Sequence, residues 1–198
     1  MKERSKKRLA NSFIFVAAIF VGVILNEVYI DFKEPFDKSY GYAIADSTYL
    51  VSVYLGCSTC VYSNTEEVIS SSKTIIDKVK SITDSLGISY LSIGVSRDKN
   101  LNEGINHLLK VNKFNEISTG NDWHSVLLNH YIWDKGLVSS ATPQLFFIKR
   151  RYSVDTTGSR RSIGKISDEE VISVLYGSEG IENGINSVDR IIEKFQSY

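Results

Sequence analysis

The chain has 198 residues and a formal net charge of zero, with 42% hydrophobic and 11% aromatic residues. This length and composition are typical of a folded protein with a full hydrophobic core, and they exclude an intrinsically disordered chain. The neutral balance gives no global basic bias toward nucleic acid. We therefore expect one main globular domain and no nucleic-acid partner.

The first thirty residues have the pattern of a membrane anchor. Residues 1–8 contain five Lys or Arg and one Glu, and the stretch Leu9 to Leu25 that follows carries no charge. Seventeen uncharged residues are close to the shortest helix that crosses a bilayer. The pattern predicts a cytoplasmic basic tail over 1–8 and a transmembrane helix over 9–30, because basic residues stay on the cytoplasmic side.

Two alternatives for this segment are less well supported. A cleaved signal peptide needs small residues shortly after the apolar run, and residues 26–29 (NEVY) supply none. A buried core helix normally keeps a polar stripe, which this segment lacks. We expect a single-pass, uncleaved anchor, a linker over 31–46 and a domain over 47–198 that is extracytoplasmic, either periplasmic or at the cell surface.

The domain opens with a strand, a helix and a second strand. "YLVSVYL" (49–55) is rich in β-branched and aromatic residues and predicts a buried strand that ends at Gly56. Residues spaced by three and four from Val68 to Leu86 predict a helix closed by Gly87. "ISYLSIGV" (88–95) predicts the second strand, parallel to the first.

The second half predicts a mixed α/β order with an antiparallel finish, because the link between the last two strands is short. The expected elements are helices over 101–111 and 123–133, strands over 144–149 and 161–166, a helix that begins behind Ser167 in "SDEEVISVL", and a final helix in "INSVDRIIEKF".

The only two cysteines, Cys57 and Cys60, lie directly after the first predicted strand. As a disulfide staple they would close a four-residue loop worth only about 2 kcal/mol. As a zinc site they lack partners, because His124 and His130 would not converge on one helix face. A CxxC pair at the end of a strand in a βαβ unit predicts a reactive dithiol, without a metal ion or a cofactor.

The expected helix after the cysteines suggests a role for each sulfur. Free N–H groups and the helix dipole at a helix N-terminus favour a thiolate, so we expect Cys57 to be the exposed nucleophile. Cys60, one turn further along, would then resolve the mixed disulfide.

Two motifs, "VYLGCSTC" and "ATPQLFFI", resemble the thioredoxin superfamily over about residues 47–176. The resemblance implies a three-layer fold around a central mixed sheet and a cis proline, Pro143, that faces the dithiol. It also implies that Thr142, the residue before this proline, offers its backbone to the substrate. The long span between the motifs looks more like the larger membrane-anchored, extracytoplasmic TlpA-like relatives, with a helical insertion before the cis-proline strand.

The chain departs from thioredoxin itself around the dithiol. Gly56 stands where thioredoxin has Trp, Ser58 and Thr59 stand where it has Gly-Pro, and Val51 stands where it has a buried carboxylate. These differences leave the direction of electron flow unassigned.

The resulting hypothesis is a thiol-disulfide oxidoreductase that acts on protein thiols and disulfides and is reset by a redox partner. One alternative is a binding or assembly module that keeps the fold but turns over little. Another is a Cu(I)-handling protein, since two thiolates suit Cu(I), although no methionine lies near the pair.

Overall fold

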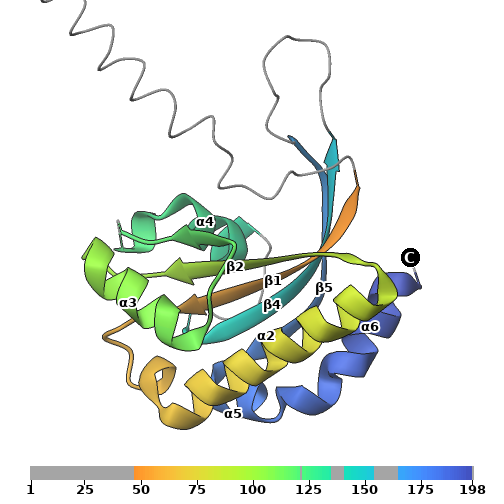
Figure 1. Ribbon diagram of the computed structural model, residues 1–198. Coiled ribbons are helices and arrows are strands. Elements are labelled where there is room, and N and C mark those ends of the chain that lie inside the picture. The colour runs from red at the N-terminus through yellow and green to blue at the C-terminus, as the bar shows by residue number, and fades with distance from the viewer. Residues whose placement is uncertain (1–46, 121, 135–140, 154–164, 198) are drawn as a thin grey trace, which may run out of the picture. The chain divides into compact units, whose positions relative to one another are not determined.

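The computed structural model describes residues 47–120, 122–134, 141–153 and 165–197 (Figure 1). The predicted basic tail, anchor and linker lie outside these ranges. Within the described ranges, no helix is both long and apolar enough to cross a membrane.

The described chain is an α/β structure around one five-stranded mixed sheet with strand order β3-β2-β1-β4-β5. The elements are β1 (Thr48–Gly56), η1 (Tyr62–Asn64), α2 (Glu66–Leu86), β2 (Ser89–Ser96), α3 (Leu101–Val111), β3 (Glu116–Ser118), η2 (Asp122–His124), α4 (Val126–Asn129), η3 (His130–Asp134), β4 (Gln144–Ser153), β5 (Lys165–Tyr176), α5 (Gly177–Glu182), η4 (Gly184–Ser187) and α6 (Val188–Gln196). Strand β1 pairs parallel with β2 and antiparallel with β4, which pairs antiparallel with β5. This order confirms the parallel βαβ unit and the antiparallel finish.

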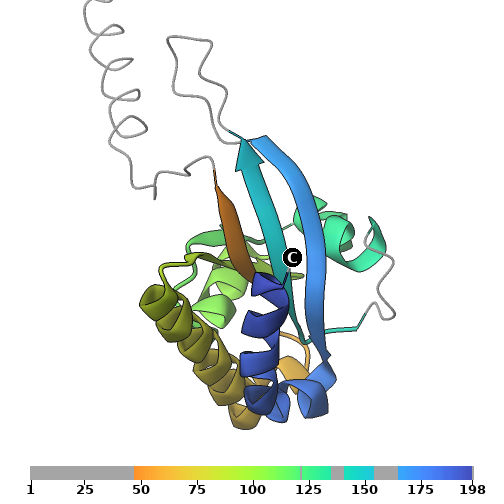
Figure 2. The same ribbon diagram turned by 90° about the vertical axis from the view of Figure 1, so that its right-hand side faces the viewer.

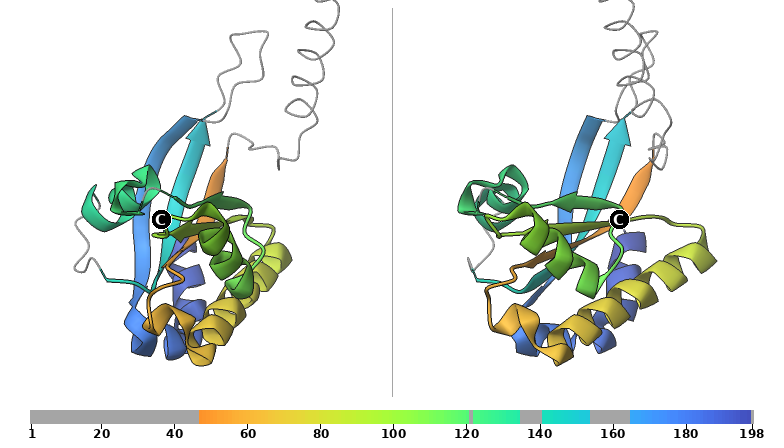
Figure 3. Two further views of the ribbon diagram at one scale, coloured as in Figure 1. Left: turned by 90° about the vertical axis from the view of Figure 1, so that its left-hand side faces the viewer. Right: turned by 60° about the vertical axis from the view of Figure 1, so that its left-hand side comes forward.

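Strand β1 is central and is buried on both faces. Leu50 and Tyr54 pack with α2, α5 and α6 on one face, whereas Val51, Val53 and Leu55 pack on the other face with α4 and η3. Figures 2 and 3 show α2 and α6 on the side of the sheet opposite α4. Burial on both faces explains why the strand reads as a continuous apolar run instead of an alternating one.

Helix α2 begins and ends at the residues that its sequence signals indicate. Thr65 is the N-cap, and its hydroxyl accepts a hydrogen bond from the N–H of Val68 at 3.3 Å. Gly87 ends the helix with φ 67°, a left-handed conformation that suits glycine. The expected apolar stripe is wrong at Leu86, which is 50% exposed because it lies in the last turn, beyond the core that α2 covers.

The predicted helix behind Ser167 is wrong, because these residues form β5. In the register with β4, the acidic run 168–170 lies opposite the basic run 149–151. The acidic residues that look like the first turn of a helix are therefore cross-strand partners of Lys and Arg, and tertiary pairing outweighs the local helix signal.

Three other parts of the chain differ from the sequence-based expectation. The expected helix over 123–133 is broken at Ser125, which has an extended backbone, and the chain continues as α4 and the π-helical segment η3. The three-residue strand β3 and the short helix α5 were not predicted, since neither is long enough to show a periodic pattern.

A buried charged network fastens η3 to the sheet. The Arg150 side chain donates from Nε to Glu169 Oε2 at 2.6 Å and from its terminal nitrogens to the hydroxyls of Tyr152 and Tyr131. Glu169 Oε1 lies 2.9 Å from His130 Nε2. Arg150 is only 3% exposed, so its charge depends on these partners in place of water.

Removing the carboxylate of this network should strongly destabilise the fold. We predict that Glu169→Ala lowers the free energy of unfolding by about 3–5 kcal/mol, because it leaves the Arg150 guanidinium buried without its anion. Urea denaturation measures this change. The matched control is Lys80→Ala, which breaks the exposed Lys80–Asp84 pair and should cost about 0.5 kcal/mol or less. Equal costs for the two variants would show that the buried pair adds nothing beyond a surface pair.

Candidate functional site

The two cysteines lie in a turn between β1 and α2. The turn is closed by a hydrogen bond from the N–H of Cys60 to the carbonyl of Cys57 at 3.3 Å. The 3₁₀ turn η1 follows, and α2 begins only at Glu66. The expectation that Cys57 lies at the N-terminus of the helix is therefore wrong, because residues 61–65 separate the dithiol from α2.

The exposure of the two thiols is the reverse of the expectation. Both cysteines are free, but Cys57 is fully buried at 0% exposure and Cys60 is partly exposed. The Sγ atom of Cys57 lies 3.2 Å from Thr59 Oγ1. The prediction that Cys57 is the exposed thiol is wrong, since Cys57 is buried where it follows the buried end of β1, with its sulfur against the side chain of Thr59.

The structure brings Cys60 and Thr142 together across 82 residues of sequence. The Sγ atom of Cys60 donates to the carbonyl oxygen of Thr142 at 3.3 Å. The peptide bond between Thr142 and Pro143 is cis, as expected for this position. Pro143 directly precedes β4, which pairs with β1, so the sheet itself holds this segment beside the dithiol turn.

The surroundings of Cys60 favour its thiolate. Burial of the sulfur raises the pKa of the thiol, but the nearby side chains of Ser63 and Thr142 and the nearby backbone of Ser63 and Tyr62 lower it more. The pKa of Cys60 therefore lies below that of an ordinary thiol, which increases the fraction present as the nucleophilic thiolate.

Asn64 holds the turn from one side. Its Nδ2 atom donates to the carbonyls of Cys57, Ser58 and Cys60 at 3.0, 2.9 and 2.7 Å. An amide nitrogen has two hydrogens, so the three carbonyls share them. The other end of the side chain, Oδ1, lies 3.2 Å from Nδ1 of His107, which fixes the orientation of the amide.

His107 and Tyr54 are the next two residues in this series of contacts, which leads from Asn64 into the core. Nε2 of His107 lies 3.4 Å from the hydroxyl of Tyr54, and His107 is 1% exposed. Burial lowers the pKa of His107, as does the charge of Lys110, while Asp98 opposes them. Gly56 makes room for the pair, since a Cβ there would lie 2.6 Å from both His107 Nε2 and the Tyr54 ring.

Asp98 holds the turn from the other side. It follows β2, and its two carboxylate oxygens lie 2.9 and 3.1 Å from the N–H of Ser58, whose hydroxyl donates to Oδ1 at 2.6 Å. Ser96 donates a further short hydrogen bond to Oδ2. Burial raises the pKa of Asp98, but the bonds from Ser58 and Ser96 and the charge of His107 lower it more, so the carboxyl is ionised.

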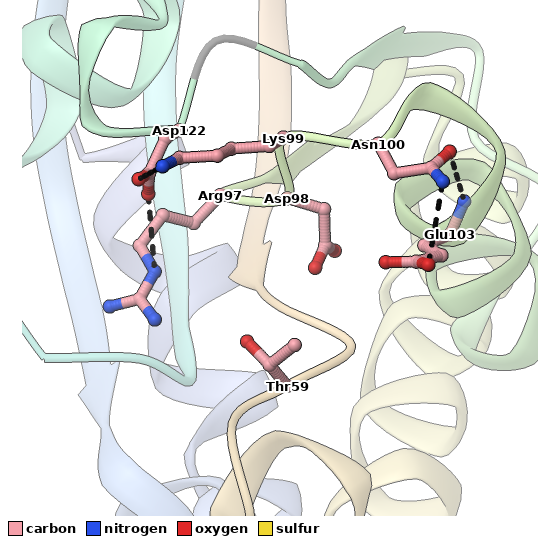
Figure 4. Close-up of a pocket in the computed structure, with 7 residues that line it drawn as sticks. All are labelled: Thr59, Arg97, Asp98, Lys99, Asn100, Glu103 and Asp122. Carbon is pink, nitrogen blue, oxygen red and sulfur yellow. Dashed lines mark hydrogen bonds and ion pairs between the residues drawn. The ribbon is translucent and has the colours of Figure 1, made fainter.

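A polar cleft of about 270 Å³ adjoins the turn at Thr59 (Figure 4). Its other lining residues are Arg97, Asp98, Lys99, Asn100, Glu103 and Asp122. Arg97 and Lys99 converge on Asp122 at 3.8 and 3.7 Å, and the Asp98 carboxylate points toward the turn that carries Thr59. The side of the turn next to Cys57 therefore faces paired charges.

Sequence reasoning found the dithiol and the Thr-Pro segment but missed Asn64, Asp98 and His107. Only Asp98 had a usable signal, because it follows a predicted parallel strand at the edge where the cysteines also lie. Among the described residues, no group of three or more His, Cys, Asp or Glu side chains is arranged to hold a metal ion. Comparisons with protein-family models, curated proteins and solved structures find no match to this chain.

Loss of the Asn64 donor should loosen the turn. We predict that Asn64→Asp lowers the free energy of unfolding by about 1–3 kcal/mol, because carbonyl oxygens then face a carboxylate. The control Asn183→Asp removes one exposed bond to the carbonyl of Glu179 and should cost about 1 kcal/mol or less. Urea denaturation at neutral pH compares the two variants. A smaller loss of unfolding free energy for Asn64→Asp than for Asn183→Asp would contradict the role of Asn64 in holding the turn.

The buried His107 should make stability depend on pH. Its pKa is lowered in the folded state, so the unfolded chain binds a proton first and stability falls as the pH drops below about 6.5. The slope for one proton is at most about 1.4 kcal/mol per pH unit. The lowered pKa of Asp98 also makes the free energy of unfolding fall with pH, but only below about pH 4.

Denaturation curves between pH 7 and pH 5 measure the His107 contribution. His107→Gln should flatten the dependence, whereas the control His124→Gln, at an exposed position, should leave it unchanged. An unchanged slope in His107→Gln would refute the assignment.

Proposed function

We propose that this protein is a thiol-disulfide oxidoreductase that exchanges disulfides through the dithiol Cys57–Cys60. The observation that carries the proposal is the 3.3 Å contact between the Cys60 sulfur and the Thr142 carbonyl. This contact places a free thiol beside an irregular backbone segment. Disulfide exchange needs a nucleophile for the partner disulfide and nearby backbone that can bind the partner chain.

The arrangement of the sheet supports a thioredoxin-like domain of the anchored TlpA-like type. A parallel β1-α2-β2 unit carries the dithiol after its first strand, and the antiparallel pair β4-β5 carries the cis proline before its first strand. The segments η2, α4 and η3 stand where a helical insertion before the proline strand is expected.

The site also supports a reactive role for the cysteines over a structural one. Both thiols are free, and neighbouring polar groups lower the pKa of Cys60 despite its partial burial. The turn is held by Asn64 and Asp98 through hydrogen bonds that do not involve either sulfur. A turn that is already fixed does not need a disulfide to stabilise it.

The surface beside Cys60 suits a polypeptide partner. Val61 and Tyr62 follow Cys60 directly and are 78% and 63% exposed. Exposed apolar side chains next to a functional group favour contact with another protein. The proposed partners are therefore protein thiols and disulfides, together with a redox protein that resets the dithiol.

The proposed location follows from the N-terminal sequence alone. A basic tail and an apolar span would anchor the chain in a membrane with the domain on the extracytoplasmic side. A dithiol in that compartment meets disulfide-bonded proteins, which persist where the environment is oxidising.

Catalysis of disulfide exchange by the full-length chain tests the proposal. We expect it to accelerate either the reduction of insulin disulfides or the oxidative refolding of reduced ribonuclease, because a dithiol with a stabilised thiolate attacks disulfides faster than a free thiol. The double variant Cys57→Ser, Cys60→Ser should lose this acceleration and keep its circular dichroism spectrum.

Equal rates for the native chain and the double variant in both assays would contradict the proposal. Retained partner capture by the double variant would then favour the binding module, and stoichiometric Cu(I) uptake by the reduced native chain would favour copper handling.

A further inference from the structure

We propose that Gln144 and Gly177 are positioning residues for partner binding, because they hold the carbonyls on either side of Thr142 and so fix the backbone that the partner contacts. The inference rests on the proposed function, which places the partner chain at Thr142, and it names the residues that shape this binding segment. Three features support it: the bond made by the buried Gln144 amide, the backbone conformation of Gly177 and the unpaired N–H of Thr142.

Gln144 holds the carbonyl before Thr142. Its Nε2 atom donates a short hydrogen bond to the carbonyl of Ala141, three residues back along the chain. Gln144 is the first residue of β4 and is 1% exposed, whereas Ala141 is exposed. A buried amide costs free energy unless it is hydrogen-bonded, so it adds less to an apolar core than an apolar side chain would. What this amide provides is the closure of the loop that contains Thr142 and Pro143.

Gly177 holds the carbonyl after Thr142. Its N–H donates to the carbonyl of Pro143 at 2.9 Å, one residue beyond the last pair of β4 and β5, Gln144 with Tyr176. Gly177 has φ 64°, a left-handed conformation that residues with a Cβ rarely adopt. A Cβ there would meet no heavy atom within 4 Å apart from its chain neighbours. The backbone conformation that aims this N–H, and not lack of space, therefore requires glycine.

Thr142 itself has one backbone group bound and one open. Its carbonyl accepts from the Cys60 sulfur at 3.3 Å. Among the hydrogen bonds between described residues, none uses its N–H, although Thr142 is only 8% exposed. Nearly all N–H groups in such surroundings are paired. A backbone carbonyl of the partner chain would supply the acceptor, as in the addition of a strand to an exposed backbone.

The two outer bonds act on affinity and not on the chemical step. A flexible loop must be ordered when a partner binds, and this ordering weakens the affinity. The bonds from Gln144 and Gly177 order the loop before the partner arrives. Neither bond involves a sulfur atom. A small disulfide that makes no backbone contact with Thr142 should therefore react independently of both residues.

Two substrates of different size separate positioning from a general structural role. The first is insulin or reduced ribonuclease, whichever the full-length chain acts on, and its concentration is varied to give kcat and KM. The second is an aromatic bis(nitrobenzoate) disulfide, which is too small to need the backbone of Thr142. Its reaction with the reduced chain releases a coloured thiolate, which gives the rate.

The variant Gln144→Met keeps a long side chain and removes the donor. We expect it to raise KM for the protein substrate about five- to tenfold, as for the loss of one hydrogen bond, with kcat and the small-disulfide rate within about twofold of the native values. An unchanged KM, or a small-disulfide rate that falls as far as kcat/KM for the protein substrate, would overturn the role of Gln144.

The variant Gly177→Ala should also raise KM alone, because alanine disfavours the conformation that aims the N–H. Its matched control is Gly87→Ala. Gly87 has φ 67° and the same open space for a Cβ, but it lies between α2 and β2. The control should keep the native KM. An equal rise of KM in Gly177→Ala and Gly87→Ala would show a general loss of stability and overturn the role of Gly177.

The proposed function can fail separately from this inference. If the native chain acts on neither protein substrate, amide hydrogen exchange of residues 141–145 still tests the hold on the loop, and Gln144→Met should exchange faster there than the native chain. Faster exchange without catalysis would support the hold and contradict the function. Catalysis with an unchanged KM in both variants would support the function and overturn the positioning roles.

Discussion

The position of both sulfurs depends on the hydrogen bonds that hold the backbone of the turn 57–60. Asn64 binds the carbonyls of Cys57, Ser58 and Cys60, while the carboxylate of Asp98 binds the N–H and hydroxyl of Ser58. These bonds, together with the backbone bond from the N–H of Cys60 to the carbonyl of Cys57, hold the turn without a helix start or a disulfide. On this fixed backbone, the buried Cys57 has its sulfur against Thr59, and the sulfur of Cys60 contacts the carbonyl of Thr142.

The sheet explains why these groups meet. β1 and β2 run parallel, so the dithiol turn and Asp98 both follow strands that end at the same edge. β4 runs antiparallel to β1, so its first residues, just after Thr142 and Pro143, lie at that edge as well. His107 comes from α3, which packs on the same face as Tyr54. Segments 82 residues apart in sequence therefore line one site because of strand direction.

The elements with a periodic or capped sequence could be predicted, and those set by tertiary partners could not. β1, α2 and β2 carry β-branched runs, a Thr N-cap and a Gly C-cap, and the structure confirms them. β5 contradicts its local pattern because its acidic run pairs with the basic run of β4. At the site, the CxxC spacing identified the dithiol, and the resemblance to the thioredoxin superfamily identified Pro143. The burial of Cys57 and the roles of Asn64 and His107 depend on contacts between distant segments, which one sequence does not encode locally.

Redox titration of the full-length chain tests the central claim most directly. The protein is equilibrated with glutathione buffers of increasing oxidising power, trapped with acid and analysed by mass spectrometry. The account predicts one reversible two-electron transition to an intramolecular Cys57–Cys60 disulfide. Its midpoint assigns the direction of electron flow, with a value near −270 mV typical of a reductant and one near −120 mV typical of an oxidant. Two thiols that remain reduced at every glutathione ratio, or that form only disulfides between chains, would contradict the proposed role of the dithiol.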